Sequence, residues 1–521
     1  MKKISQINWK RYKDSANGKD AIALFEKAQT NEFSHEEMLA LAKRFDPEFF
    51  NNCGPKEEEY MLKLFDYFDS VVGDMLNEFG DVSEQGKSIM FFQTLMTAML
   101  ADNDDQKWDD LPQSGFKNIL SDNILLSTVL FAYIPEFYIP NYFVMQFAYL
   151  ERIAEKYDIE LPKVPSRADY KSRNLYYIEL CKIFNAFAEL NNLDTPAEKC
   201  AFLFDYELPV AKEELENEKN RELPEKPGYA WLLVGNYGDG EKDMKHGFWQ
   251  ANEMTNKGDI MLFYEKSPVK ALNAIYIAQA DGVVDPFFHY YSNTYIGNKI
   301  SIPSEQAITI DDFRNSEYFQ KRDKKGNFVS KNFQDTSGWK VTFNDYKEIK
   351  RMLKEKGYDV SKLPCLYEPK KIGNITISVE KDVSEKLLIP LLEQMGWKKG
   401  IDFEGELEFN AGRGKTGFSS DKRPDFCLHF TEKNDEIEAK VVIEVKKFMN
   451  GKDGIQANFI QGHSYAKWGN AQVLVLCDME KILVYERGKD NKFNEKKFIQ
   501  YSWIDMENPD KYHELKQLLS K

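Results

Sequence analysis

The chain has 521 residues, of which 42% are hydrophobic and 30% charged, so it is long enough for three or four domains and too apolar for wholesale disorder. The longest apolar run, near Ile124–Ile134, is too short to span a bilayer, and no apolar stretch follows the two N-terminal lysines. These features exclude a secretory signal and a transmembrane helix. We therefore expect a cytoplasmic protein without a membrane partner.

The net charge of −15 lies entirely in the first part of the chain. Residues 1–228 contain 26 Lys and Arg against 41 Asp and Glu, whereas the remaining residues are close to neutral. Because affinity for phosphates comes from Lys and Arg, we do not expect residues 1–228 to form the main nucleic-acid-binding surface. The six cysteines and six histidines are scattered, without the paired spacing of a zinc site, so any metal chemistry has to come from carboxylates.

Residues 1–215 are expected to form a helical domain. Apolar residues recur there at spacings of three and four, as in Met61, Leu64, Phe65, Phe68 and Val72. The stretch 134–208 contains IPEFYIPNYF and ends in CAFLFDYELP, and it resembles a helical region of proteins associated with McrBC-type restriction systems. The alternative is a plain helical bundle whose aromatic residues are core. The charged, proline-bracketed stretch that comes next predicts a linker at 216–228.

Residues 229–366 change in character. Short β-type runs such as WLLVGNY and NAIYIAQADGVV alternate with Gly, Asp and Asn, which predicts a small barrel with helices attached. Two tryptophans, the segment KGDIMLFY at 257–264 and the run 282–284 resemble the EVE family of the PUA-like superfamily, although a long loop at 285–299 and a polar stretch at 313–337 depart from it.

The EVE resemblance implies a pocket that holds a flipped, modified DNA base against aromatic rings. The base-binding candidates are Trp231, Trp249, Phe263 and Tyr264. The alternative for each of these side chains is that it belongs to the core of the barrel.

Residues 371–521 carry a carboxylate–lysine pattern on a predicted hairpin. Asp425 stands at the start of the first strand, and alternation puts Glu444 and Lys446 on one face of the second. Two carboxylates and the Val445 carbonyl suffice for Mg²⁺, or Mn²⁺ in its place, because such ions keep several waters. Lys446 is suited to orient the attacking water or to neutralise charge on phosphorus.

This pattern resembles the PD-(D/E)XK nuclease superfamily, with Pro424-Asp425 followed by Glu444-Val445-Lys446. The resemblance implies an α/β restriction-endonuclease-like fold and adds Glu385, on a predicted helix at 378–397, to the catalytic set. It also adds Gln461 and Tyr465, which lie four residues apart on one helix face. Each residue also has an alternative interpretation. Asp425 and Glu444 can be ordinary strand-end acids paired with lysines, and Glu385 a solvated helix acid. Gln461 and Tyr465 can be packing and capping residues.

The loop before the hairpin contains a phosphate-loop look-alike. Gly412–Thr416 resembles the end of a Walker A motif, but Phe409 stands where that motif needs a glycine, so we expect no NTP cofactor. The cations of this segment are better suited to meet DNA phosphates; they are Arg413, Lys415, Lys422 and Arg423.

The sequence therefore predicts a multidomain protein with an α-helical N-terminal part, a PUA-like/EVE mixed β-barrel and a C-terminal restriction-endonuclease-like domain. The expected function is a Mg²⁺-dependent DNA endonuclease of the modification-dependent restriction type, in anti-phage defence. Its expected partner is double-stranded DNA, and a homo-oligomer is expected. Two alternatives remain: a non-catalytic reader of modified DNA, and a non-specific nuclease triggered by a small nucleotide.

Overall fold

The computed structural model divides the chain into two compact units. The first comprises residues 1–225, 230–341 and 348–363, and the second 226–229, 342–347 and 364–521. The structure describes residues 1–520 apart from 31–32, 51–52, 80–88, 104, 225, 237–246, 327–332, 334–337, 374, 408–422, 434–435 and 489–490. No described helix is both long enough and apolar enough to cross a membrane.

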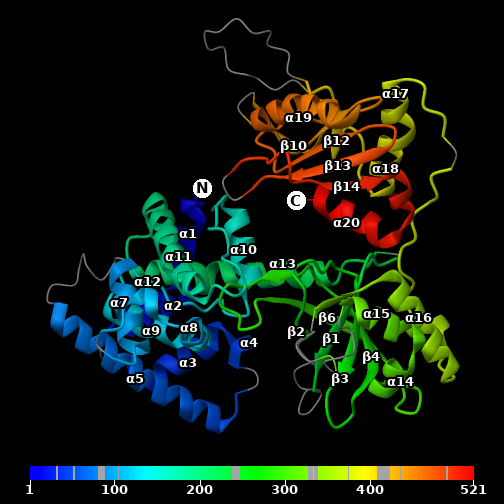
Figure 1. Cartoon of the computed structure of the whole chain (residues 1–521). Coiled ribbons are helices and arrows are strands. Elements are labelled where there is room, and N and C mark those ends of the chain that lie inside the picture. The colour runs from blue at the N-terminus through cyan, green and yellow to red at the C-terminus, as the bar shows by residue number, and fades with distance from the viewer. Residues whose placement is uncertain are drawn as a thin grey trace, which may run out of the picture. The chain divides into compact units, whose positions relative to one another are not determined.

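The N-terminal part of the first unit is helical, as the apolar spacing predicts (Figure 1). Its helices are α1 (Gln6–Asp14), α2 (Ala16–Ala28), α3 (His35–Phe45), α4 (Pro47–Phe50), α5 (Pro55–Phe79), α7 (Ile89–Leu100), α8 (Gln113–Ser121), α9 (Asn123–Tyr133), α10 (Phe147–Lys156), α11 (Tyr170–Asn191), α12 (Pro196–Ala201) and α13 (Leu208–Lys219). The aromatic stretch after α9 is core, since Tyr138 and Tyr142 are fully buried. We call residues 1–219 the helical region.

Helix α13 runs into the segment that the sequence predicts as a linker. It continues to Lys219, and its buried residues Leu208, Ala211 and Leu215 lie at helical spacing on one side. This narrow apolar stripe is enough to hold a charged helix against its neighbours, chiefly α10 and the helical turn Phe202–Glu207. The expected linker at 216–228 is therefore helical in its first four residues.

A mixed eight-stranded sheet comes next in the same unit, with the order β2-β6-β4-β3-β1-β8, β5 beside β6 and β7 beside β4. Its elements are β1 (Ala230–Gly235), β2 (Phe248–Gln250), β3 (Ile260–Glu265), β4 (Ala271–Ala278), β5 (Val283–Val284), β6 (Ser292–Ser301), β7 (Ile308–Thr309) and β8 (Trp339–Val341), with α14 (Ile310–Asn315) and α15 (Glu317–Gly326). Helix α16 (Phe343–Glu355) follows, and its residues up to Lys347 are assigned to the second unit. Strands β1 and β3 pair in parallel. The prediction of a long loop at 285–299 is wrong for its second half, because residues 292–301 form strand β6.

The second unit is built on a six-stranded sheet with the order β14-β13-β12-β11-β10-β9. Its elements are α17 (Glu380–Val383), α18 (Ile389–Gln394), β9 (Phe403–Gly405), β10 (Phe426–Lys433), β11 (Glu436–Val445), α19 (Gly451–Trp468), β12 (Val473–Cys477), β13 (Lys481–Glu486), β14 (Ile499–Ser502) and α20 (Pro509–Leu519). The predicted hairpin is confirmed by the antiparallel pairing of β10 with β11, and β11 pairs in parallel with β12.

Helices cover both faces of this sheet (Figure 1). Val441, Ile443 and Val445 of β11 share one core with α18 and α20. Val442 of the same strand belongs to a second core that includes Phe459 and Ala466 of α19. Because side chains alternate along a strand, Glu444 lies on the α19 face.

Candidate active site and ligand pocket

The hairpin brings Asp425 beside the end of β11. Phe426 pairs with Ile443 in the antiparallel register, so Asp425, one residue earlier, lies next to Glu444 and Val445. The Val445 backbone N–H donates to Asp425 Oδ2 at 2.6 Å. This bond fixes one carboxylate oxygen on the strand that carries the second acid.

Lys446 joins the two acids. Its Nζ donates to Glu444 Oε1 at 2.7 Å and to the Val445 carbonyl at 2.9 Å, and it lies 3.9 Å from Asp425 Oδ2. The side chain of Glu444 is 2% exposed, whereas those of Asp425 and Lys446 are 33% and 22% exposed. The site therefore has a buried acid at its base, with a second acid and a lysine accessible from solvent.

Helix α19 adds Gln461 and Tyr465. Gln461 Nε2 donates to Glu444 Oε1 at 2.7 Å and lies 3.2 Å from the Tyr465 hydroxyl. The next residue is Gly462, where a Cβ would lie 2.8 Å from Leu474 Cδ1. The glycine thus lets α19 approach the sheet closely enough for Gln461 to reach Glu444.

The electrostatics of the site show an excess of negative charge. Burial raises the pKa of Asp425. Burial, followed by the charge of Asp425, also raises the pKa of Glu444. Burial pulls the pKa of Lys446 down, but its hydrogen bond to Glu444 and the charges of both acids outweigh that effect and raise it. One ammonium group faces two carboxylates, so a cation is favoured there.

These residues fit a divalent cation. Glu444 Oε2 is buried and has no hydrogen-bond partner among the residues that the structure describes, and a buried carboxylate oxygen without a partner is costly. Asp425 and the Val445 carbonyl, which keeps a second lone pair beside Lys446, would complete the protein's share of a Mg²⁺ shell. Within the described ranges, no group of three or more His, Cys, Asp and Glu side chains is arranged to bind a metal, so water would fill the remaining positions.

The expectation that Glu385 joins the catalytic set needs correction. Glu385 is 54% exposed and pairs with Lys381 at 3.4 Å, and it is not among the main charges that shift the pKa values of the three central residues. The helix acid among these charges is Glu380, at the start of α17, which raises the pKa of both Asp425 and Glu444; Glu406 also raises the pKa of Asp425. Helical spacing explains the error: it shows that a helix has several acids but not which of them turns towards a distant strand.

The expected phosphate-contacting loop lies mostly outside the described residues. Arg413, Lys415 and Lys422 fall in the range 408–422, as does the Gly412–Thr416 motif. Arg423 is described and exposed, and it directly precedes the buried Pro424 at the start of the hairpin. This position puts one cation two residues from Asp425.

The four aromatic candidates of the first sheet separate into core and cavity residues. Trp231 is 1% exposed and donates from Nε1 to Asp259 Oδ2 at 2.8 Å, and Phe263 is fully buried. Both belong to the core, which corrects the expectation that they contact a base. Tyr264 is buried with its ring 4.6 Å from that of Phe333, although it lines a smaller cavity with Lys270 and Arg314.

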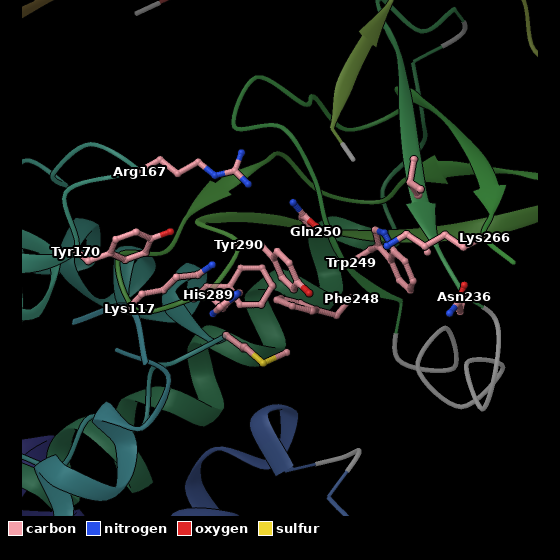
Figure 2. Close-up of a pocket in the computed structure, with 14 residues that line it drawn as sticks. Lys117, Arg167, Tyr170, Asn236, Phe248, Trp249, Gln250, Lys266, His289 and Tyr290 are labelled. Atoms are coloured by element: carbon pink, nitrogen blue, oxygen red, sulfur yellow. The ribbon is translucent and has the colours of Figure 1, made fainter. Parts of the chain in front are cut away.

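Trp249 is the candidate that lines a cavity of about 570 Å³ in this unit (Figure 2). Gly235 makes room for it, because a Cβ there would clash with the indole ring. The cavity is lined from both the helical region and the sheet, by Lys117, Met145, Arg167, Tyr170, Val234, Gly235, Asn236, Phe248, Trp249, Gln250, Lys266, Phe288, His289 and Tyr290. We call it the composite cavity.

The helical region holds one wall of the composite cavity in place. Arg173 of α11 is buried and donates to the carbonyl oxygens of Pro286 at 2.9 Å and Phe288 at 2.6 Å. In return, Asp285 Oδ2 accepts from the backbone N–H of Met145 at 2.8 Å. The loop 285–291, which carries Phe288, His289 and Tyr290, is thereby held by α11 and by the turn before α10, both far away in the sequence.

Sequence reasoning missed most of this lining. Lys117 and Arg167 are separated by more than 60 residues from the strands that they face, so no local pattern reveals them. Phe248 stands beside Trp249 and was open to detection as a second aromatic of the same short strand.

Comparisons of the chain with protein-family models, with curated proteins and with solved structures give no match. A function for this chain therefore has to be inferred from the geometry of its two sites.

Proposed function

We propose that the protein is a Mg²⁺-dependent DNA endonuclease whose C-terminal unit is a PD-(D/E)XK nuclease of the restriction-endonuclease-like fold. The observation that carries the proposal is the convergence of Asp425, Glu444 and Lys446, with Gln461 bonded to Glu444. A strand hairpin and a helix that are independent in sequence supply these four side chains. An ordinary surface acid is exposed to solvent, whereas Glu444 is buried and accepts hydrogen bonds from both a lysine and a glutamine.

Each residue has a definite role in phosphodiester hydrolysis. Asp425 and Glu444 bind and orient the cation, and Gln461 fixes the rotamer of Glu444. A bound Mg²⁺ supplies a water of lowered pKa and neutralises charge on the phosphate. Lys446 lies beside both acids, where its ammonium group stabilises the negative charge that builds up on phosphorus in the transition state.

We further propose that the eight-stranded sheet is a PUA-like domain of the EVE type that directs cleavage to modified DNA. Trp249 on the wall of the composite cavity supports this assignment, with Phe248 and Tyr290 as further aromatic surface. A flipped base can be held by stacking in such a cavity. The whole would act as a homo-oligomeric, modification-dependent restriction enzyme in anti-phage defence, in the cytoplasm.

One digestion series tests the proposal. The purified chain is incubated with unmodified, cytosine-methylated and hydroxymethylated DNA, each with Mg²⁺ and with excess chelator. We expect cleavage with Mg²⁺ only, and more of it on one modified substrate. Cleavage that is equal in chelator contradicts the nuclease assignment, and equal cleavage of all three substrates contradicts sensing of these modifications.

A further inference from the structure

The composite cavity has a charge opposite to that of the region that forms half of it. Its charged lining residues are Lys117 and Arg167 from the helical region and Lys266 from the end of the sheet, and no Asp or Glu among the described residues lines it. The helical region otherwise carries a large negative excess. Among the described residues, none of the three cations is paired with a carboxylate.

The cations lie at the two ends of the cavity, with aromatic rings between and beside them. Figure 2 shows Arg167, Lys117 and Tyr170 on one side of the cavity, Phe248 and Tyr290 in the middle, and Lys266 beside Trp249 on the other. A ligand that fills the cavity therefore meets two cations at the helical side, aromatic rings in the middle and one cation, Lys266, at the far side. Arg and Lys bind phosphate oxygens, and aromatic rings stack on bases.

His289 gives a second sign of a positive field. Burial lowers its pKa, and the charges of Lys117, Arg173 and Arg167 lower it further. Its Nδ1 lies 3.5 Å from Ser121 Oγ of the helical region. Beyond burial, the lowered pKa reflects the positive field of these neighbouring cations at the cavity wall.

We infer that the composite cavity binds a nucleotide unit as a whole, with Lys117 and Arg167 of the helical region holding its phosphate while the base lies against Trp249 and Phe248. This inference rests on the proposed function of the sheet domain as a sensor of bases and extends it. The helical region is then part of the sensor, because it supplies the phosphate contacts and, through Arg173, fixes the loop that carries His289 and Tyr290. A volume of about 570 Å³ suits a ligand of this size.

The phosphate can come from a free nucleotide or from a nucleotide turned out of a DNA strand, and the experiment separates these sources. Calorimetry on the full chain compares 5-methyldeoxycytidine, its 5′-monophosphate and a short single-stranded oligonucleotide that contains the same base. The variants are Lys117→Gln and Arg167→Gln. The matched control is Lys163→Gln, a lysine of the same region that does not line the cavity.

We expect the monophosphate or the oligonucleotide to bind at least roughly tenfold more tightly than the nucleoside, since a hydrogen bond to a charged group contributes that much. Each of the two variants should lose about tenfold, and the control should match the parent. Tight binding of the monophosphate identifies a free nucleotide as the source. Tight binding of the oligonucleotide alone, lost in the same variants, identifies a DNA strand.

Equal binding of the nucleoside and its phosphorylated forms, unchanged in both variants, would overturn the inference and leave base sensing intact. Absence of binding by all three probes would overturn the inference as well. In that case the digestion series decides separately whether the sheet domain senses a modified base, and neither outcome touches the Mg²⁺-dependent nuclease.

Discussion

Gln461 Nε2 donates a hydrogen bond to Glu444 Oε1 at 2.7 Å, and the same oxygen accepts from Lys446 Nζ at 2.7 Å. The two donors occupy one carboxylate oxygen and leave Glu444 Oε2 buried without a partner among the described residues. The orientation of the buried acid is thus set from a helix as well as from its own strand. This division of the two oxygens is what a cation-binding carboxylate requires, with one oxygen held by the protein and the other available.

Replacing Gln461 should therefore damage the site without unfolding it. Gln461→Ala removes a donor that orients Glu444, and outer-shell partners of this kind typically change metal affinity or activity by roughly 10–100-fold. We expect a loss of that size in the cleavage rate at limiting Mg²⁺. Gln456→Ala is the control, because Gln456 belongs to the same helix but makes no contact with Glu444 among the described hydrogen bonds. Equal rates for both variants would show that the hydrogen bond has no role in activity.

Glu380 and Glu385 should behave differently although they lie on one helical segment. The charge of Glu380 acts on Asp425 and Glu444, whereas Glu385 is paired with Lys381. Removing a negative charge near a cation site weakens attraction for the cation. Glu380→Gln should raise the Mg²⁺ concentration needed for half-maximal cleavage severalfold, and Glu385→Gln should leave it unchanged. The reverse order would restore Glu385 to the site.

Mg²⁺ affinity should increase with pH. Burial and the charge of Asp425 raise the pKa of Glu444, so this acid keeps its proton to a higher pH than an ordinary carboxyl. Cation binding requires the ionised form and displaces that proton. Calorimetric titration with Mg²⁺ should therefore show weaker binding at about pH 5.5 than at about pH 8. A constant affinity over this range would mean that Glu444 is not a ligand.

The two tryptophans of the first sheet should separate stability from ligand binding. Trp231→Phe removes the donor to the buried Asp259 and should lower the free energy of unfolding by roughly 1–3 kcal/mol in urea denaturation. Trp249→Ala should instead weaken binding of the modified base by roughly 1–3 kcal/mol, the usual contribution of base stacking. Unchanged base binding by the folded Trp249→Ala protein would show that the base does not bind against Trp249.

Local sequence patterns were enough to predict single helices and strands and the pairing of strands that are adjacent in sequence. Two β-type runs with a polar segment between them were enough to predict the hairpin, which the register confirms. The parallel pairing of β11 with β12 was not accessible, because it depends on how α19 crosses the sheet. The contact between Gln461 and Glu444 follows from the same crossing.

Burial on both faces of a strand explains why the aromatic candidates could not be ranked. All residues of β1 and five of the six residues of β3 are buried, so no alternation marks an outward side. Trp231 and Phe263 therefore look like Trp249 in sequence and differ only in tertiary position. Lys117 and Arg167 could not be predicted as cavity residues for a related reason. They belong to an acidic region, and its net charge does not show which cations line a cavity.

The most direct test of the nuclease assignment compares DNA cleavage and DNA binding by the parent, Asp425→Ala and Lys446→Ala, in Mg²⁺ and in Ca²⁺. We predict cleavage by the parent in Mg²⁺ only, and binding without cleavage in Ca²⁺. Asp425→Ala should lose cleavage together with cation binding. Lys446→Ala should bind DNA and the cation but turn over on the order of 10²–10³ times more slowly, the usual cost of one electrostatic contact made in the transition state. Full activity in either variant, or cleavage by the parent in excess chelator, would contradict the assignment.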